Sequence, residues 1–203
     1  MKTEKLVFIV STSLWLFAVG AGLSILSSYS SAPGTERPAP LQWPRDSKIK
    51  TETGRSTLVM MVHPRCPCSR ASIAELARLM TQAQGLLSAR VIFWEPKGVS
   101  ETWAKSDLWT SAAAIPGVTV MLDVEGEEAR RFGGETSGQT FLYNAKGRLQ
   151  FSGGITVARG HAGDNAGRSA ILALVSEKPA TIAATPVFGC SLLNPQTGGT
   201  KCR

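Results

Sequence analysis

The chain has 203 residues, about the length of one domain. Hydrophobic residues make up 43% and charged residues 18%, which fits a globular core and excludes a disordered chain, a collagen-like repeat or a polytopic membrane protein. The formal net charge of +7 would by itself permit a nucleic-acid or anionic-membrane partner. The basic residues are scattered, however, with Arg130 and Arg131 as the only adjacent pair, so we expect a solvated basic surface and no nucleic-acid partner.

The N-terminus contains a segment suited to a membrane. Lys2 and Lys5 precede residues 6–26, which carry no charge and would span about 31 Å as a helix, the thickness of a bilayer's hydrocarbon core. A signal peptide has a shorter apolar core of about 7–15 residues and a small-residue cleavage site, and residues 27–32 make a weak one. We therefore expect residues 1–31 to be a single-pass signal anchor in the cell inner membrane, with the C-terminal domain on the periplasmic side. A cleaved signal peptide is the alternative, and it exports the same domain.

Three further segments follow the predicted anchor. Residues 32–56 contain turn formers and charges with little apolar periodicity, as in a linker. Residues 57–176 alternate short apolar runs with helical patterns and form the predicted domain. Residues 177–203 are rich in Thr, Pro and Gly and form a C-terminal tail.

The first half of the domain predicts alternating strands and helices. Residues 58–62 are a continuous apolar run, typical of a strand buried on both faces. A helix is predicted over residues 69–84 from its apolar spacing. A strand at 91–94, a helix over 100–114 and a strand at 118–122 follow.

The second half predicts a hairpin and a last helix. A short helical stretch at 127–132 precedes strands at 140–143 and 149–151, which a four-residue turn joins. The last helix starts near Asp164, a good N-cap, and includes Val175. This order predicts an α/β fold, with a central mixed sheet flanked by helices and completed by an antiparallel hairpin.

Two cysteines leave the first predicted strand just before a helix, in the run HPRCPC from His63 to Cys68. With that position and element order, the chain resembles the thioredoxin-like superfamily over about residues 50–176, and in particular the exported, membrane-anchored TlpA-like and SCO-like proteins. Residues 137–144 resemble their late strand and hairpin. Residues 132–134 and 153–161 are also similar to the RedB-like group. The resemblance implies a thioredoxin-like fold with Cys66 and Cys68 at the active site.

Two features depart from the thioredoxin pattern. Thioredoxins carry Cys-x-x-Cys, whereas Cys66 and Cys68 are separated by one residue, so either could match the usual nucleophile. Thioredoxins also place a cis-proline before the late strand, and the nearest equivalent here is Gly138.

The chemistry of the cysteine pair predicts thiol–disulfide exchange. A thiol at a helix N-terminus has a lowered pKa, and Arg65 and Arg70 are expected to act in the same direction. A low-pKa thiolate beside a second thiol can attack a disulfide and then resolve the mixed disulfide. We predict a thiol–disulfide oxidoreductase with no cofactor, whose partners are the thiols or disulfides of exported proteins. Structural cysteines, in a degenerate fold used only for interaction, are a weaker alternative.

The two histidines open a second interpretation. His161 is a candidate catalytic base facing the cysteines, or else an exposed loop residue, with Asp164 either orienting it or capping the last helix. Soft thiolates and imidazole also suit Cu(I) or Zn(II), and SCO-like proteins use cysteines and a distant His for copper. The alternative function is therefore a copper-binding or copper-delivery protein using Cys66, Cys68, His161 and His63.

The tail contains the two remaining cysteines, Cys190 and Cys202. Their even number in an exported protein favours a disulfide between them. The alternative is that Cys190 packs onto the domain near Cys66 and acts as a third redox partner.

Overall fold

The computed structural model describes residues 2–99 and 101–192, and its contacts divide these into two compact units. The first, Met1–Ala32, is formed by α1 (Lys2–Ser31). Within it, Thr3–Ser31 is long and apolar enough to cross a membrane, as predicted from residues 6–26. The second unit, Pro33–Arg203, holds the mixed sheet and its helices.

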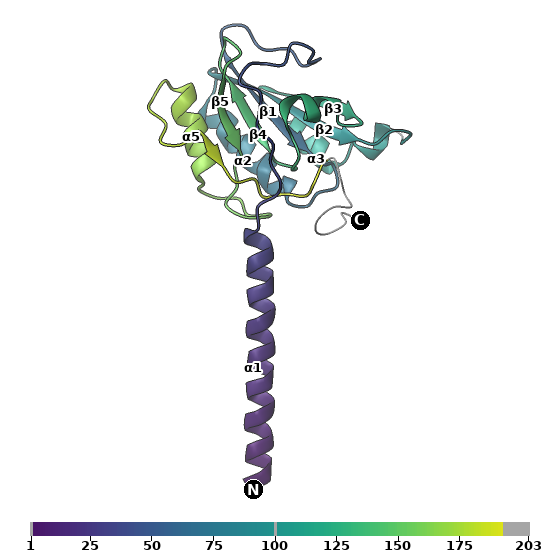
Figure 1. Cartoon of the computed structure of the whole chain (residues 1–203), viewed down its shortest axis with the longest axis vertical. Coiled ribbons are helices and arrows are strands. Elements are labelled where there is room, and N and C mark those ends of the chain that lie inside the picture. The colour runs from purple at the N-terminus through teal and green to yellow at the C-terminus, as the bar shows by residue number, and fades with distance from the viewer. Residues whose placement is uncertain (1, 100, 193–203) are drawn as a thin grey trace. The chain divides into compact units, whose positions relative to one another are not determined.

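The sheet has six described strands in the order β3-β2-β1-β4-β5-β6 (Figure 1). The first three are β1 (Ser56–Val62), β2 (Leu87–Glu95) and β3 (Val118–Val124), which run parallel to one another. The strands β4 (Thr140–Tyr143) and β5 (Leu149–Gly153) form the predicted antiparallel hairpin, with β4 beside β1. A two-residue strand that was not predicted, β6 (Ala184–Thr185), extends the edge in parallel with β5.

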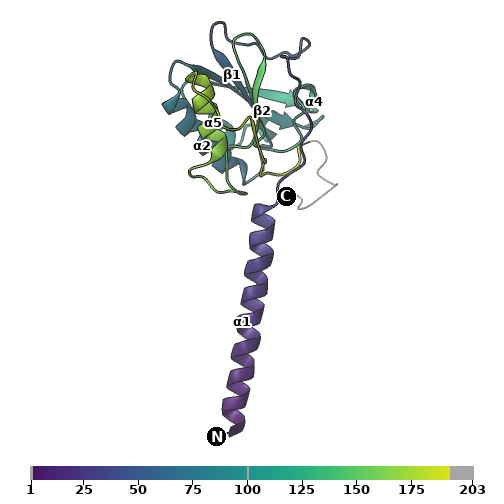
Figure 2. The same cartoon turned by 60° about the vertical axis from the view of Figure 1, so that its left-hand side comes forward.

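The helices cover both faces of this sheet. They are α2 (Ser69–Gln82), the 3-10 turn η1 (Glu101–Trp103), α3 (Asp107–Ala113), α4 (Glu127–Phe132) and α5 (Ala166–Val175). Figure 2 shows α2 and α5 side by side. The single helix predicted over 100–114 is two elements, because Ser106 adopts an extended conformation and starts α3; residue 100 lies outside the described residues.

Successive side chains of β1 point to opposite faces of the sheet, so the core has two layers. Leu58, Met60 and Val62 pack with apolar residues of α2, α3 and α5. Val59 and Met61 pack on the opposite face with residues of α4 and β4. β1 is thus buried on both faces, as its continuous apolar sequence predicted.

The segment predicted as a linker packs against this second layer. Ile49 is buried there, and Trp43 makes edge-to-face contacts with Phe132 and Tyr143 at centroid distances of 5.1 Å. The Trp43 backbone N–H also donates to the carbonyl of Gly147, 2.8 Å away. The part of the chain after α1 therefore belongs to the compact unit.

Candidate active site

Cys66 and Cys68 lie in the turn between β1 and α2, as predicted. β1 ends at Val62, and the N–H of Cys66 then donates to the carbonyl of His63 at 3.1 Å. Cys68 is the N-cap residue of α2, although its side chain makes no capping hydrogen bond. Both cysteines therefore lie at the C-terminal end of the central strand and the N-terminus of α2.

A third cysteine completes the site. The Sγ atoms of Cys66 and Cys190 are 2.9 Å apart, and those of Cys66, Cys68 and Cys190 all lie within 4.8 Å of one another. Cys66 is fully buried, and the other two are 9% exposed. No disulfide joins these three residues to one another. The arrangement is a buried cluster of three sulfurs within reach of exchange.

Backbone pairing places Cys190 at this position. The carbonyl of Cys190 accepts from the N–H of Ser137 at 2.8 Å, and the N–H of Leu192 donates to the carbonyl of Glu135 at 2.7 Å. Thr136 and Ser191 form an antiparallel bridge between these two bonds. The tail therefore runs along the loop before β4 in the manner of a short β-strand.

The cluster stabilises the thiolate of Cys66. Hydrogen bonds from the Cys190 and Cys68 side chains lower the pKa of Cys66 far below its ordinary value, and they outweigh the opposing effect of burial. The Ser69 side chain and a backbone hydrogen bond from Cys190 act in the same direction. The cluster therefore favours the thiolate form of Cys66.

Cys68 shifts in the opposite direction. Its hydrogen bond with Cys190 lowers its pKa, but the hydrogen bond to Cys66, burial and the negative charge on Cys66 together raise it above the ordinary value. The surroundings of the two cysteines of the motif therefore differ in effect: they favour the thiolate of Cys66 and the protonated thiol of Cys68.

The flanking arginines, predicted to stabilise the thiolate, have other partners. The Arg65 guanidinium lies 4.8 Å from the centre of the Trp103 ring, and Arg70 pairs with Asp107. The hydrogen bonds within the cysteine cluster, rather than these two cations, account for the lowered pKa of Cys66.

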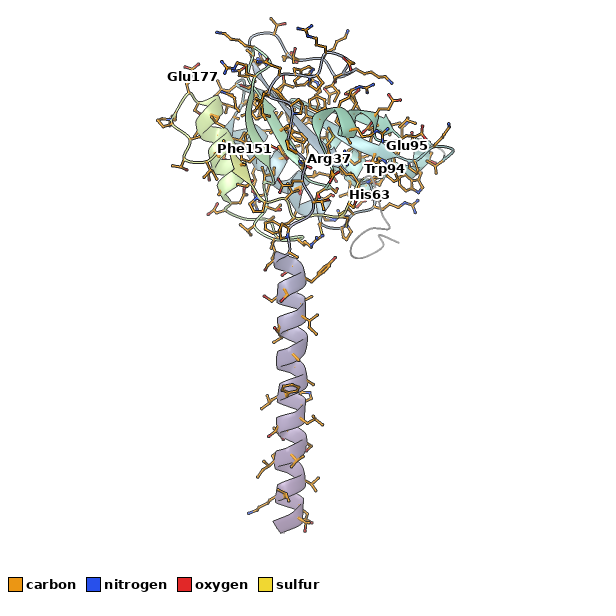
Figure 3. The ribbon with its side chains drawn as sticks, viewed as in Figure 1. Arg37, His63, Trp94, Glu95, Phe151 and Glu177 are labelled. Atoms are coloured by element: carbon orange, nitrogen blue, oxygen red, sulfur yellow. The ribbon has the colours of Figure 1, made fainter. Side chains whose placement is uncertain are left out.

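His63 lies in an aromatic pocket beside the cluster. Its ring stacks on Trp94, with ring centres 5.3 Å apart, and meets the edge of Trp103 at 5.9 Å. Figure 3 labels His63 and Trp94 close to each other. Its Nδ1 accepts from the N–H of Arg65 at 3.2 Å. Burial lowers the pKa of His63, against the opposing influence of the Cys66 charge. The imidazole is therefore neutral at pH 7.

The loop before β4 connects these parts. Ser137 Oγ accepts from the N–H of His63 at 2.7 Å and lies 2.6 Å from the Ser69 hydroxyl. The next residue, Gly138, stands where thioredoxins have proline. It has a φ of +91°, and its N–H donates to the carbonyl of Met61 at 2.7 Å, a bond that proline could not make.

The structure does not bring His161 to the cysteines. Its side chain is exposed, its Nδ1 lies 2.8 Å from the carbonyl oxygen of Arg159, and neither histidine belongs to the three-cysteine group. Arg159 of the same loop contacts the site instead, because its guanidinium donates to the carbonyl of Gly189. Asp164 pairs with Arg168 and is not the helix cap, since Asn165 starts α5.

The sequence left the position of Cys190 open. The structure places it beside Cys66, while Cys202 lies outside the described residues, so the predicted Cys190–Cys202 disulfide is untested. Gly189 is a local sequence feature that fits this position of the tail, because a Cβ there would lie 1.9 Å from the carbonyl oxygen of Ser137. The sequence also gave no indication of the contact between Arg159 and the tail.

Solved structures share this architecture. A hypothetical protein from Sinorhizobium meliloti superposes with a TM-score of 0.57 at 20% identity, covering 80% of this chain and 94% of that one. An uncharacterized conserved protein from Geobacillus kaustophilus gives a TM-score of 0.57 at 16% identity, covering 83% and 95%. The exposed lipoprotein thioredoxin Etrx1 from Streptococcus pneumoniae gives 0.45 at 17% identity, covering 62% and 86%. No protein-family model and no curated protein matches the chain.

The second unit has a thioredoxin-like fold, as predicted. The mixed sheet with its strand order and the cysteines between β1 and α2 form the predicted architecture, and the Sinorhizobium and Geobacillus proteins share it. The particular form found here has a three-cysteine centre, with the third sulfur supplied by the C-terminal tail. The narrower resemblance to the RedB-like group stays a prediction.

Proposed function

We propose that this protein is a membrane-anchored thiol–disulfide oxidoreductase that acts on exported proteins, with Cys66 as its nucleophile. The observation that carries the proposal is the lowered pKa of Cys66 within a cluster of three sulfurs. A thiolate is the attacking form in exchange, and a second thiol nearby is needed to release the product. The cluster supplies both.

The cellular location in this proposal follows from α1. Lys2 and Lys5 lie at the N-terminal end of α1, before its uncharged residues 6–26, which favours a cytoplasmic N-terminus and an exported domain. We place the anchor in the cell inner membrane and the domain in the periplasm. Disulfides form and persist in that oxidising compartment, so substrate proteins with thiols or disulfides are available there.

The exchange itself requires access to Cys66. The thiolate attacks one sulfur of a substrate disulfide, forms a mixed disulfide and releases the other substrate sulfur as a thiolate. Since Cys66 is fully buried, the parts that cover it must move before a protein substrate can react. His161 remains a proposed base, without a described contact to the cluster.

The test is catalysed reduction of a protein disulfide, with insulin as the probe and dithiothreitol as the reductant, by the full chain in detergent micelles. Cys66→Ser should abolish the catalysed rate while the protein stays folded. Thr181→Ala, at an exposed position of the tail, is the matched control and should keep it. Full activity in Cys66→Ser would contradict the proposed function.

A second candidate is binding of a soft metal ion. Three buried sulfurs within 4.8 Å of one another are a ligand set suited to Cu(I) or Zn(II). The copper site predicted from the sequence used His161 as a ligand, whereas this set uses Cys190. The three thiolates would hold the ion and exclude water from it.

Metal analysis separates the two candidates. The reduced full chain is loaded with Cu(I) or Zn(II), passed through a desalting column and analysed by mass spectrometry of the intact protein. One tightly held ion, lost in Cys190→Ser and in Cys66→Ser alike, supports metal binding. No retained ion, together with catalysed insulin reduction, supports the oxidoreductase.

A further inference from the structure

We propose that Cys190 is the resolving cysteine of the site and that the disulfide formed with each reaction cycle joins Cys66 to Cys190. This inference rests on the proposed oxidoreductase function and assigns the second reacting group to the tail, outside the Cys-Pro-Cys motif. The first observation is the distance of 2.9 Å between the two sulfurs. A disulfide bond is about 2.05 Å long, so a small displacement joins them.

The second observation is that the tail is held on the site by contacts on several sides. Two backbone hydrogen bonds fasten it to the loop 135–137, and Arg159 binds the carbonyl of Gly189. Further along the tail, the carbonyl of Val187 accepts from the N–H of Gly34 at 2.8 Å. The N–H of Val187 donates to Glu36 at 3.1 Å. The position of Cys190 is therefore specified by the fold.

The third observation is the small space in which the tail runs. Val187 and Leu192, which flank the Gly189–Cys190 pair, are each 1% exposed and anchor the segment in the protein interior. Gly189 lies so close to Ser137 that no side chain would fit between the two backbones. A cysteine one residue after this contact is directed onto Cys66.

Cys68 is less suited to the same role. A disulfide between Cys66 and Cys68 would close a small ring that Pro67 restricts further, and such a geometry is strained. Cys68 also keeps its proton, because its pKa is raised. Cys190 approaches Cys66 from a segment 124 positions away in the sequence, so the bridge it forms closes no small ring.

The reaction balances with a protein disulfide as the oxidant. The Cys66 thiolate attacks one substrate sulfur, the substrate S–S bond breaks, and a mixed disulfide and one substrate thiolate form. Cys190 then gives its proton to that thiolate, attacks Cys66 in the mixed disulfide and releases the second substrate sulfur as a thiolate. The substrate disulfide gains two electrons, and the Cys66–Cys190 pair loses two.

The tail also controls the access of a substrate to Cys66. In the reduced protein the tail pairs with the loop 135–137, whose Ser137 contacts His63 and Ser69 on either side of the cysteine motif, and Cys66 is fully buried. An extended peptide that carries the substrate cysteine can replace this pairing only when the tail moves away. The return of the tail then brings Cys190 back to the mixed disulfide.

Peptide mapping tests the inference directly. The reduced full chain in detergent is oxidised with excess insulin, quenched in acid, alkylated and digested for mass spectrometry. We expect a peptide that joins Cys66 to Cys190. A Cys66–Cys68 or a Cys190–Cys202 linkage as the main product would overturn the inference.

Serine variants test it independently. Cys190→Ser should accumulate a mixed disulfide between Cys66 and insulin and lose multiple turnover, whereas Cys68→Ser, which removes one hydrogen bond to the Cys66 thiolate, should turn over more slowly but accumulate no mixed disulfide. Cys202→Ser is the matched control in the same tail and should behave as the wild type. Turnover in Cys190→Ser with loss in Cys68→Ser would overturn the inference and leave the proposed function intact, whereas activity in Cys66→Ser would overturn both.

Gly189→Ala moves the tail without changing any sulfur. The new Cβ would collide with the carbonyl of Ser137, so we expect loss of the Cys66–Cys190 linkage in the peptide map and faster alkylation of Cys66 in the reduced protein. Thr181→Ala is the matched control and should show neither change. An unaltered linkage in Gly189→Ala would contradict the role given to the tail.

Discussion

At the scale of single residues, the site depends on neighbours that are distant in sequence. A cysteine at a helix N-terminus has a lowered pKa in general. The thiolate of Cys66 is stabilised chiefly by the Cys190 side chain, and Cys68 adds to the effect. A buried thiolate without such donors would be costly, because burial alone raises a thiol's pKa.

The shift makes the stability of the reduced protein depend on pH. The ordinary pKa of this thiol is 9.0. Below about that pH the unfolded chain binds a proton at Cys66, whereas the folded chain favours the thiolate. The contribution of Cys66 is therefore fully present above that value and is lost as the pH falls toward the lowered pKa. With dithiothreitol present, the difference in urea unfolding free energy between wild type and Cys66→Ser should grow from pH 5 to about pH 9.

The same residue can be followed through the ultraviolet absorbance of its thiolate. The wild-type signal should persist into acid, and Cys190→Ala should move its loss to higher pH, because the principal hydrogen-bond donor is gone. Cys190→Ser, which keeps a hydroxyl donor, should shift the pH of this loss by less. An identical titration in wild type and Cys190→Ala would contradict the contacts described.

The buried imidazole of His63 gives a second dependence on pH. Because its pKa is lowered, the unfolded state binds a proton that the folded state rejects, and stability is lost as the pH falls through the ordinary value of 6.5. His63→Gln should cost about 0.5–1.5 kcal/mol at pH 8 through loss of the Trp94 stack. The cost should shrink at pH 5, as measured by urea unfolding. His161→Gln, at an exposed position, should change neither value.

At the scale of elements, a buried carboxylate joins α2 to the segment that enters α5. Glu75 in α2 is fully buried and lies 2.9 Å from Arg168 Nε. It also accepts from the N–H of Gly163 at 2.8 Å and from the Asn165 side chain at 3.2 Å. One charge thereby satisfies donors from both elements and fixes the loop that carries Arg159.

Removing that charge should destabilise the domain. Glu75→Gln removes the buried carboxylate that faces Arg168 and leaves its guanidinium only the pair with the exposed Asp164; a buried pair broken in this way costs about 3–5 kcal/mol. Glu127→Gln is the matched control, since its partner Lys48 is exposed and water screens such a pair, so its loss should change stability little. Urea unfolding of both variants measures the difference. Equal costs would show that the buried pair has no special role.

The sequence predicted elements better than it predicted contacts. The continuous apolar run of β1 and the spacing in α2 are local signals, and both elements formed where expected. The helix predicted over 100–114 was interrupted because Ser106 turns to donate its hydroxyl to the carbonyl of Pro64, a contact between distant segments. Tertiary contacts of this kind leave no local periodicity.

The same limit applies to the site. The positions of Cys66 and Cys68 followed from a strand end and a helix start, which are local features. Cys190 reaches them through pairing between the tail and the loop 135–137, which no spacing in the sequence indicates. Likewise, Trp43 and Ile49 are isolated apolar residues, so their packing on the sheet could not be predicted from periodicity.

At the scale of the whole molecule, the segment that leaves α1 and the tail that carries Cys190 meet within the second unit. Gly34 and Glu36 lie just after the first unit and bind both backbone groups of Val187. The tail is thus held by the stretch that follows α1 as well as by the site itself. A substitution in the segment after α1 or in the tail should therefore alter the position of Cys190.

The membrane attachment yields the last prediction. Thr3–Ser31 is apolar and long enough to span a bilayer, and residues 27–32 make a weak cleavage site, so the mature protein should keep this helix. The full chain should stay in the membrane fraction after carbonate washing, and N-terminal sequencing should find its first residues. A protease added to spheroplasts should degrade the domain, because lysines at the N-terminal end of α1 favour a cytoplasmic N-terminus. Deletion of residues 1–32 behind a cleavable export signal is the control and should release a soluble domain. A mature N-terminus near Ala32 in the full-length protein would show that the helix is a signal peptide and that the exported domain acts without an anchor.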